Sequence, residues 1–196
     1  PFYALNSVDM IATISMGRTD FDLEHFPGLR RSATAPDNLN VYTGANKSSP
    51  LVPKLLSEPL SDIEFVQYSL PYQAMMTAKG PYKVNDNRTI TILGQASLGQ
   101  GNLSQSDDIK GKKVENKTFD AQSLAELDNT IAVEGGGGGY LSNEISYRSI
   151  LLRNELASTI PTGHIHTPRI KGFDPKVNQA IVEQIKVILE KSLTEL

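Results

Sequence analysis

Residues 135–156 (GGGGGYLSNEISYRSILLRNEL) join five consecutive glycines to a helical pattern of apolar residues. Spacing of about 3.6 residues predicts a helix whose inward face carries Leu141, Ile145, Leu152, Leu156 and Ile160. Ser142 stands at the start of this helix, where backbone N–H groups are unpaired and partial positive charge collects. The glycines permit positive φ angles and close approach of a ligand to the backbone. The stretch therefore predicts a place for a nucleophile and an oxyanion, although Ser142 also fits as a simple N-cap.

Outside this stretch, short apolar runs alternate with helical patterns. Strands are predicted at residues 10–16, 63–70, 89–93, 130–133 and 163–167. Helices are predicted from Pro71 to about Lys79, from Ser142 onward, and over residues 174–193, and one helical turn at residues 52–57. The last helix should turn Val177, Ile181, Ile185 and Ile188 inward. This alternation predicts one α/β domain over residues 1–196, a three-layer α/β/α sandwich with a mostly parallel sheet. Residues 94–129 are polar and predict an excursion from the core that contains a hairpin.

Composition excludes several classes of protein. A net charge of −3 with interspersed charges gives no basic patch for nucleic acid, and no apolar run reaches the roughly 18 residues of a membrane span. The chain has no cysteine, which excludes disulfides, zinc–thiolate sites and a thiol nucleophile. Four N-x-S/T sequons, at Asn46, Asn87, Asn102 and Asn116, leave a secreted origin open.

An acid, a hydroxyl and an imidazole follow three of the predicted strands. In parallel sheets the working site lies at the carboxyl ends of the strands, where Glu24, Ser142 and His166 would converge. A nucleophile needs a base within hydrogen-bond reach, and the base needs an orienting acid. A structural role for His166 stays open. His164 and His166 also provide two metal ligands, but no third ligand is identifiable, so no metal site and no cofactor are predicted.

Five short motifs, in order along the chain, resemble the pyroglutamyl peptidase I family. Gly17-Arg18 with Glu24 resembles the family's Gly-Arg loop, whose catalytic glutamate follows the arginine by six residues. Residues 36–38 (PDN) and 70–75 (LPYQAM) resemble a turn and a helix start that come next. Residues 139–143 (GYLSN) resemble the nucleophile motif, and residues 163–168 (GHIHTP) resemble the strand with the catalytic histidine.

The resemblance implies roles for individual residues. Glu24 would orient His166, His166 would act as the base, and Ser142 would replace the family's cysteine nucleophile. Arg18 and Tyr140 would bind the substrate, a peptide or small molecule whose N-terminal pyroglutamate is removed by acyl transfer. Serine is a poorer nucleophile than a thiolate, so the expected activity is weak or absent.

Two departures from the family leave alternatives open. Ser142 replaces the cysteine, and Ile14 stands where the family has a glutamine. These changes also fit a catalytically dead binding homologue, or a serine hydrolase of different specificity. The resemblance implies a cytoplasmic protein.

The family also begins with a strand–helix–strand–helix unit that has no counterpart here, and residues 79–129 are partly an insertion. Without that unit the sheet should expose apolar edges, which invite association. The missing part is therefore expected from a companion chain or a second copy, or from the insertion itself.

Overall fold

The computed structural model describes residues 8–37, 39–94, 115–170, 172 and 174–195. Its main sheet contains β1 (Ile11–Met16), β9 (Thr162–Thr167), β2 (Phe21–Glu24) and β5 (Val84–Asn87), in the order β1-β9-β2-β5. β1 is parallel to β9, and β2 is parallel to β5, whereas β9 and β2 are antiparallel. The predicted α/β class with a mostly parallel sheet is therefore confirmed.

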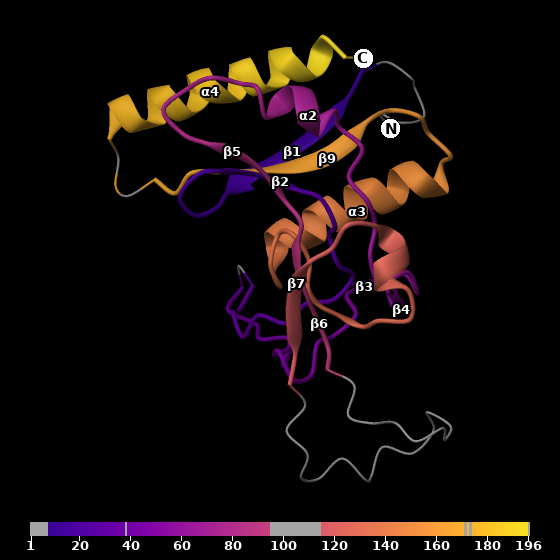
Figure 1. The fold of residues 1–196 in the computed structure, drawn as a ribbon. Coiled ribbons are helices and arrows are strands. Elements are labelled where there is room, and N and C mark those ends of the chain that lie inside the picture. The colour runs from indigo at the N-terminus through magenta and orange to yellow at the C-terminus, as the bar shows by residue number, and fades with distance from the viewer. Residues whose placement is uncertain (1–7, 38, 95–114, 171, 173, 196) are drawn as a thin grey trace, which may run out of the picture.

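Helices cover both faces of the main sheet (Figure 1). α4 (Pro175–Leu193) and the short α2 (Tyr72–Met75) lie on one face, and α3 (Leu141–Glu155) lies on the other. α4 begins as its sequence predicts, because the Asp174 side chain accepts a hydrogen bond from the Lys176 N–H and Pro175 opens the first turn. Within the described residues, no helix has the length and apolar character needed to cross a membrane.

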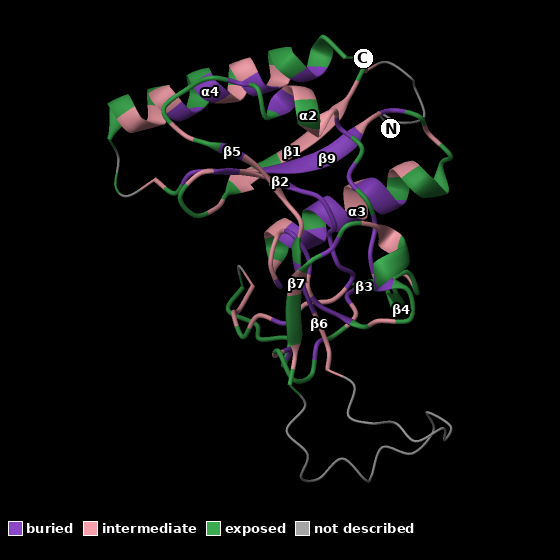
Figure 2. Cartoon of the chain, viewed as in Figure 1, coloured by how far each residue is buried: buried purple, intermediate pink, exposed green. Residues whose placement is uncertain are grey.

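The main core lies between these layers, around the central strands (Figure 2). Phe21 and Leu23 of β2 and Ile165 of β9 are fully buried. From α4, Ile181 and Ile188 are buried against this cluster, and Val177 and Ile185 pack on its margin, as predicted. Each buried aliphatic side chain of this kind contributes about 2 kcal/mol through removal from water, so the sheet–helix contacts fix the layers.

A second, smaller sheet extends from the main body. It is antiparallel, in the order β7-β6-β8, with β6 (Thr89–Ile92), β7 (Lys117–Asp120) and β8 (Ala132–Glu134). A 3₁₀ turn at Leu124–Leu127 and a separate small core that includes Phe26, Phe65 and Ile90 accompany it. β7 lies within the predicted excursion of residues 94–129, but it pairs with β6, which precedes that excursion. Residues 95–114, within which a hairpin was also predicted, lie outside the described residues.

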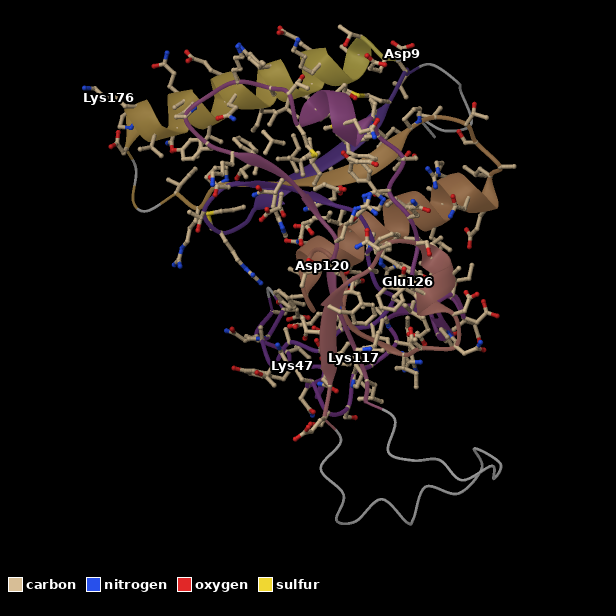
Figure 3. The ribbon with its side chains drawn as sticks, viewed as in Figure 1. Asp9, Lys47, Lys117, Asp120, Glu126 and Lys176 are labelled. Atoms are coloured by element: carbon tan, nitrogen blue, oxygen red, sulfur yellow. The ribbon has the colours of Figure 1, made fainter. Side chains whose placement is uncertain are left out.

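Charged side chains surround this second sheet on its outer surface. Lys47, Lys117, Asp120 and Glu126 all lie near it in Figure 3, so positive and negative groups are interspersed there. Asp9 and Lys176 lie far from them, beside the two ends of α4. This mixture agrees with the interspersed charge of the sequence.

Three local predictions are wrong. Residues 63–70 do not form a strand, and make only an isolated antiparallel bridge to residues 25–29. There the N–H of Val66 bonds to Pro27 O at 3.1 Å and that of Tyr68 to His25 O at 3.0 Å, whereas the N–H of Ser69 bonds to Thr162 O at 3.0 Å. Phe65, Val66, Tyr68 and Leu70 of this segment are buried, whereas Ile63, Gln67 and Ser69 are exposed. Residues 52–57 form no helical turn but lie in a small hairpin of β3 (Lys54–Leu55) and β4 (Glu58–Pro59). The helix predicted to reach Lys79 ends after α2.

The inward face of α3 also differs from the prediction. Leu141, Ile145, Leu152 and Leu156 are each at least 42% exposed, and only Ile160, beyond the helix, is buried. The buried face instead carries polar and mixed residues, which are Asn143, Glu144, Ser146, Tyr147, Ile150 and Leu151. Polar contacts at the start of the helix set this rotation, and they take precedence over the apolar spacing.

Candidate active site

The glycine loop connects β8 to α3 and is shaped by close contacts. Gly135 and Gly138 exchange backbone hydrogen bonds of 3.0 and 2.8 Å, and Gly138 has a φ of +83°, which favours glycine. A Cβ atom on Gly136 would lie 2.7 Å from Oε2 of Glu24. The glycines therefore let the backbone pass directly against a carboxyl group, at the entrance to α3.

Asn143 fixes the start of α3. Its Oδ1 accepts a hydrogen bond from the Gly28 N–H at 2.8 Å, and its Nδ2 donates to the Gly28 carbonyl at 2.6 Å. The N-cap is Tyr140, not Ser142, and Tyr140 makes no side-chain capping bond. The interpretation of Ser142 as an N-cap is therefore wrong. Ser142 occupies the second position of the helix, close to the free N–H groups of its first turn.

Glu24 and His166 form a short, buried pair. Nδ1 of His166 lies 2.5 Å from Oε1 of Glu24, and the Asn87 side-chain amide donates to Oε2 at 2.8 Å and to the Gly136 carbonyl at 3.0 Å. Glu24 is fully buried, and this burial raises its pKa to about 7, against the opposing effects of His166 and Asn87. The carboxyl group therefore titrates close to neutral pH.

The pairing of β2 with β9 brings these two side chains together. Asp22 lies opposite His166 in this antiparallel pair, and Glu24 lies two residues further on, on the same face. Glu24 and His166 are thus diagonal neighbours. The sequence predicted that Glu24 lies beyond the first strand, at the carboxyl edge that it shares with the strand of His166. β1 and β9 are parallel and their carboxyl ends meet, but Glu24 lies on a further strand, β2, which was not predicted and runs antiparallel to β9.

A pocket of about 230 Å³ contains the three predicted catalytic residues. Its lining residues are Met16, Gly17, Arg18, Asp22, Glu24, Asn87, Gly136, Gly137, Gly138, Ser142 and His166. Among the described contacts, Ser142 Oγ accepts a hydrogen bond from Ser15 at 2.8 Å and forms none with His166. Nε2 of His166 has no hydrogen-bond partner in the described part of the chain. The predicted triad therefore shares one pocket, with its acid–base contact formed and its nucleophile–base contact open.

The two residues predicted to bind substrate lie in different places. Arg18 lines the pocket of Ser142 and His166, and also a polar pocket of about 320 Å³ beside it. Tyr140 is not among the lining residues of either pocket, and its hydroxyl donates to the Pro36 carbonyl. Tyr140 therefore connects the helix start to the loop at Pro36.

Several polar residues near the site have no assigned catalytic role in the sequence analysis. Asn87 reaches Glu24 because β5 is parallel to β2 and places the two residues opposite each other. His164 entered the sequence analysis only as a metal-ligand candidate, yet it contacts Thr13 and Ser15. The sequence indicated only that Thr13 and Ser15 lie on one face of a predicted strand. It did not show which strand pairs with that one, and so did not show that His164 lies beside them.

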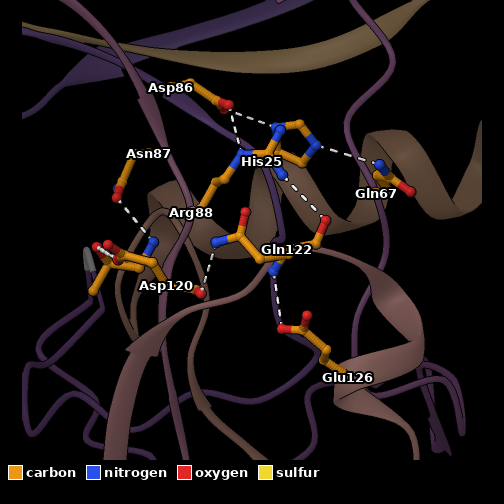
Figure 4. Close-up of polar contacts among 9 residues, drawn as sticks. His25, Gln67, Asp86, Asn87, Arg88, Asp120, Gln122 and Glu126 are labelled. Carbon is orange, nitrogen blue, oxygen red and sulfur yellow. Dashed lines mark hydrogen bonds and ion pairs between the residues drawn. The ribbon is translucent and has the colours of Figure 1, made fainter.

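His25 lies in a polar network that includes Asp86, Arg88 and Gln67 (Figure 4). Its Nδ1 lies 2.7 Å from Asp86, which also accepts from Arg88 at 2.6 Å, and its Nε2 lies 3.3 Å from the Gln67 amide. Burial lowers the pKa of His25, so its ring is neutral and donates from Nδ1 to the carboxylate. This network holds β5 beside β2, and so holds Asn87 beside Glu24.

The described residues contain no group of three or more His, Asp or Glu side chains that could hold a metal ion. The rings of His164 and His166 are 4.9 Å apart and edge-to-face. Within the described residues, His164 hydrogen-bonds to the hydroxyl groups of Thr13 and Ser15, and His166 to Glu24.

The fold is similar to solved structures of pyrrolidone carboxyl (pyroglutamyl) peptidase from Pyrococcus furiosus. One variant of that enzyme is 18% identical, with a TM-score of 0.54, over 96% of this chain and 70% of that chain. A structure described together with its cysteine-free mutant is 15% identical, with a TM-score of 0.54, over 95% of this chain and 70% of that chain. At this identity the likeness establishes the fold.

A sequence relative is known from Pseudomonas aeruginosa. Its protein PA0049 is 50% identical over 42 residues, which are 21% of this chain and 8% of that protein, so the matched segment is a small part of the relative. The model of the PA0049 C-terminal domain family matches residues 54–171, more than half of the chain. The chain therefore belongs to the PA0049 C-terminal domain family.

Proposed function

We propose that this chain carries a pyroglutamyl-peptidase-like hydrolase site in which Ser142 replaces the thiol nucleophile. The observation that carries the proposal is the buried Glu24–His166 pair, which lies in one pocket with Ser142 at the start of α3. The fold shared with pyrrolidone carboxyl peptidases supports it.

The proposed reaction begins with Ser142. Its Oγ attacks the carbonyl carbon of the substrate while Nε2 of His166 takes the hydroxyl proton, and Glu24 stabilises the resulting imidazolium. The carbonyl oxygen becomes negative near the first-turn N–H groups of α3, whose partial positive charge opposes that of the oxyanion.

The intermediate then collapses. The bond from carbon to the leaving group breaks, the leaving group takes the proton from His166, and an ester to Ser142 remains. Water attacks this ester and gives a proton to His166. That proton returns to Ser142 as the acid is released.

Two versions of this proposal differ in their substrate: one enzyme is restricted to pyroglutamate, and the other accepts substrates with an apolar group. Ser142 also lines an open, mostly apolar groove of about 560 Å³, together with Ile14, Leu141 and Ile145. Ile14 gives this wall an apolar surface where the resembling family has a glutamine. The groove favours a serine hydrolase for substrates with an apolar group over one restricted to pyroglutamate.

The alternative of a catalytically dead homologue is supported by the hydrogen bond that Ser142 accepts from Ser15, since no bond to His166 accompanies it. The proposed active site requires a small rotation of the Ser142 or His166 side chain on substrate binding, which is common in free enzymes.

The test compares a chromogenic pyroglutamyl amide with chromogenic esters of increasing apolar chain length. Turnover of the amide should be far below the roughly 10 per second of an ordinary enzyme, and longer esters should react faster. Ser142→Ala and His166→Ala should each lower ester hydrolysis at least about 1,000-fold, with Ser57→Ala, an exposed serine, as the unchanged control. Ser142→Cys should raise amide hydrolysis. Hydrolysis that survives Ser142→Ala, or its complete absence in every variant, would contradict the proposal.

A further inference from the structure

A second line of polar side chains reaches Ser142 from the side of β1. Ser15 Oγ lies 2.8 Å from Ser142 Oγ and 2.9 Å from Nε2 of His164. Nδ1 of His164 lies 2.7 Å from Thr13 Oγ1. The parallel pairing of β1 with β9 builds this line, because it places Thr13 opposite His164 and turns Thr13 and Ser15 to the same face.

The protons in this line run in one direction. Ser15 donates to Ser142, and since a hydroxyl has one proton, Ser15 must accept from Nε2–H of His164. His164 is fully buried, and burial, with His166 nearby, lowers its pKa to about 3, so its ring is neutral. A neutral ring with a proton on Nε2 accepts at Nδ1. The Thr13 hydroxyl lies 2.7 Å from Nδ1 and 3.4 Å from the Gly163 carbonyl, so the shorter contact to His164 takes its proton. Three donors in series therefore end on Ser142 Oγ.

This arrangement affects both a lone pair and the proton of Ser142 Oγ. One lone pair of Ser142 Oγ is occupied by the Ser15 hydroxyl, so the proton of Ser142 is free to turn toward the pocket that contains His166. Negative charge that develops on Oγ as the base removes its proton is stabilised by the same donor, because hydrogen bonds to charged oxygens are stronger than those to neutral oxygens. If His164 were only a structural histidine, the hydroxyls of Thr13 and Ser15 would satisfy its ring without any contact between Ser15 and Ser142.

We propose that Ser15 and His164 are positioning residues for the nucleophile: their hydrogen bonds orient Ser142 and stabilise negative charge at its oxygen. The proposal deepens the proposed hydrolase function and rests on it for its catalytic meaning. The hydrogen-bond line itself can be tested without any activity, because the chain contains no cysteine.

The first experiment uses Ser142→Cys, which introduces a single thiol at the end of the line. The rate of its alkylation by iodoacetamide, measured against pH, gives the pKa of that thiol. Adding Ser15→Ala should raise this pKa by about one unit, since the thiolate loses a donor. Ser15→Thr retains the hydroxyl and should restore the lower value. Thr13→Val should raise the pKa by less, because it acts through two intervening groups.

The charged and titratable groups that surround the thiol are the same in every variant. They are Arg18, Asp22, Glu24 and His166 in the pocket of about 230 Å³ that contains Ser142, and Glu144 and Arg148 along the apolar groove. Thr167→Val is the matched control, because Thr167 lies on β9 but donates to the Pro168 carbonyl instead. An unchanged thiol pKa with Ser15→Ala, in a variant that melts like the parent, would overturn the proposal.

The second experiment separates this proposal from the proposed function. A fluorophosphonate should label Ser142 in the original chain, and Ser15→Ala should slow that labelling about 10-fold, with recovery in Ser15→Thr. Absence of labelling in the original chain would contradict the hydrolase function while the thiol measurement still tests the line. Normal labelling with Ser15→Ala would contradict the line and leave the hydrolase function standing.

Discussion

The chemistry of the site depends most on the environment of one carboxyl group. Glu24 is fully buried, and burial raises its pKa to about 7 although its contacts with His166 and Asn87 act in the opposite direction. A carboxyl group must be charged to stabilise an imidazolium ion, and this one becomes charged only near neutral pH.

Hydrolysis, or fluorophosphonate labelling of Ser142, should therefore rise with pH, with a midpoint near 7.

Folding stability should change in the opposite sense. A group whose pKa is raised on folding stabilises the fold below its unfolded pKa, near 4.5, and that contribution is lost as pH rises through about 7. Thermal melts from pH 4.5 to 8 should show the original chain losing stability relative to Glu24→Gln. Glu155→Gln, at an exposed position of α3, is the control, and a constant difference between the chain and Glu24→Gln would contradict this prediction.

The orientation of α3 decides which of its side chains stabilise the fold. Ile150 is fully buried, whereas Leu152, two positions further along, is 42% exposed. Ile150→Ala should lower the free energy of unfolding by about 3 kcal/mol, because it leaves a cavity as well as removing apolar contacts. Leu152→Ala should cost less than about 1 kcal/mol. Urea unfolding of the two variants measures both values, and equal costs would show that the apolar stripe of the sequence faces the core after all.

At the scale of the whole molecule, an apolar surface is exposed along the edge of the main sheet. β1 is at the edge of the main sheet, and no described strand pairs with its outer side. Beside it, Ile14 and the outward residues of α3, which are Leu141, Ile145, Leu152 and Leu156, are exposed. An open strand edge next to apolar side chains favours association, either with a second copy or with a further segment.

We therefore expect the isolated 196-residue chain to associate as its concentration rises. The double substitution Ile145→Glu and Leu152→Glu should keep it monomeric, because charge on the exposed face opposes burial. Val182→Glu, an exposed position on α4 in the opposite layer, should leave association unchanged. Light scattering coupled to size-exclusion chromatography gives the masses. A chain that stays monomeric at every concentration would exclude this surface as a contact between copies.

Local patterns in the sequence were enough for much of the architecture. Apolar runs and caps predicted β1, β6, β9 and α4, because short-range hydrophobic spacing and capping are properties of a few neighbouring residues. The motifs that contain Glu24, Ser142 and His166 also identified three side chains that line one pocket. These predictions succeeded where the information lies within about ten residues of the chain.

Contacts between distant segments decided the rest. The rotation of α3 follows from Asn143 bonding to Gly28, and residues 63–70 make only an isolated bridge to residues 25–29 before Ser69 bonds to Thr162. The contact of Glu24 with His166 depends on the antiparallel register of β2 and β9, and the line from His164 through Ser15 depends on the parallel register of β9 and β1. Strand pairing and register join residues more than 100 positions apart. For this reason the sequence by itself determined which groups are available for the proposed chemistry, and only the tertiary structure decided which of them touch.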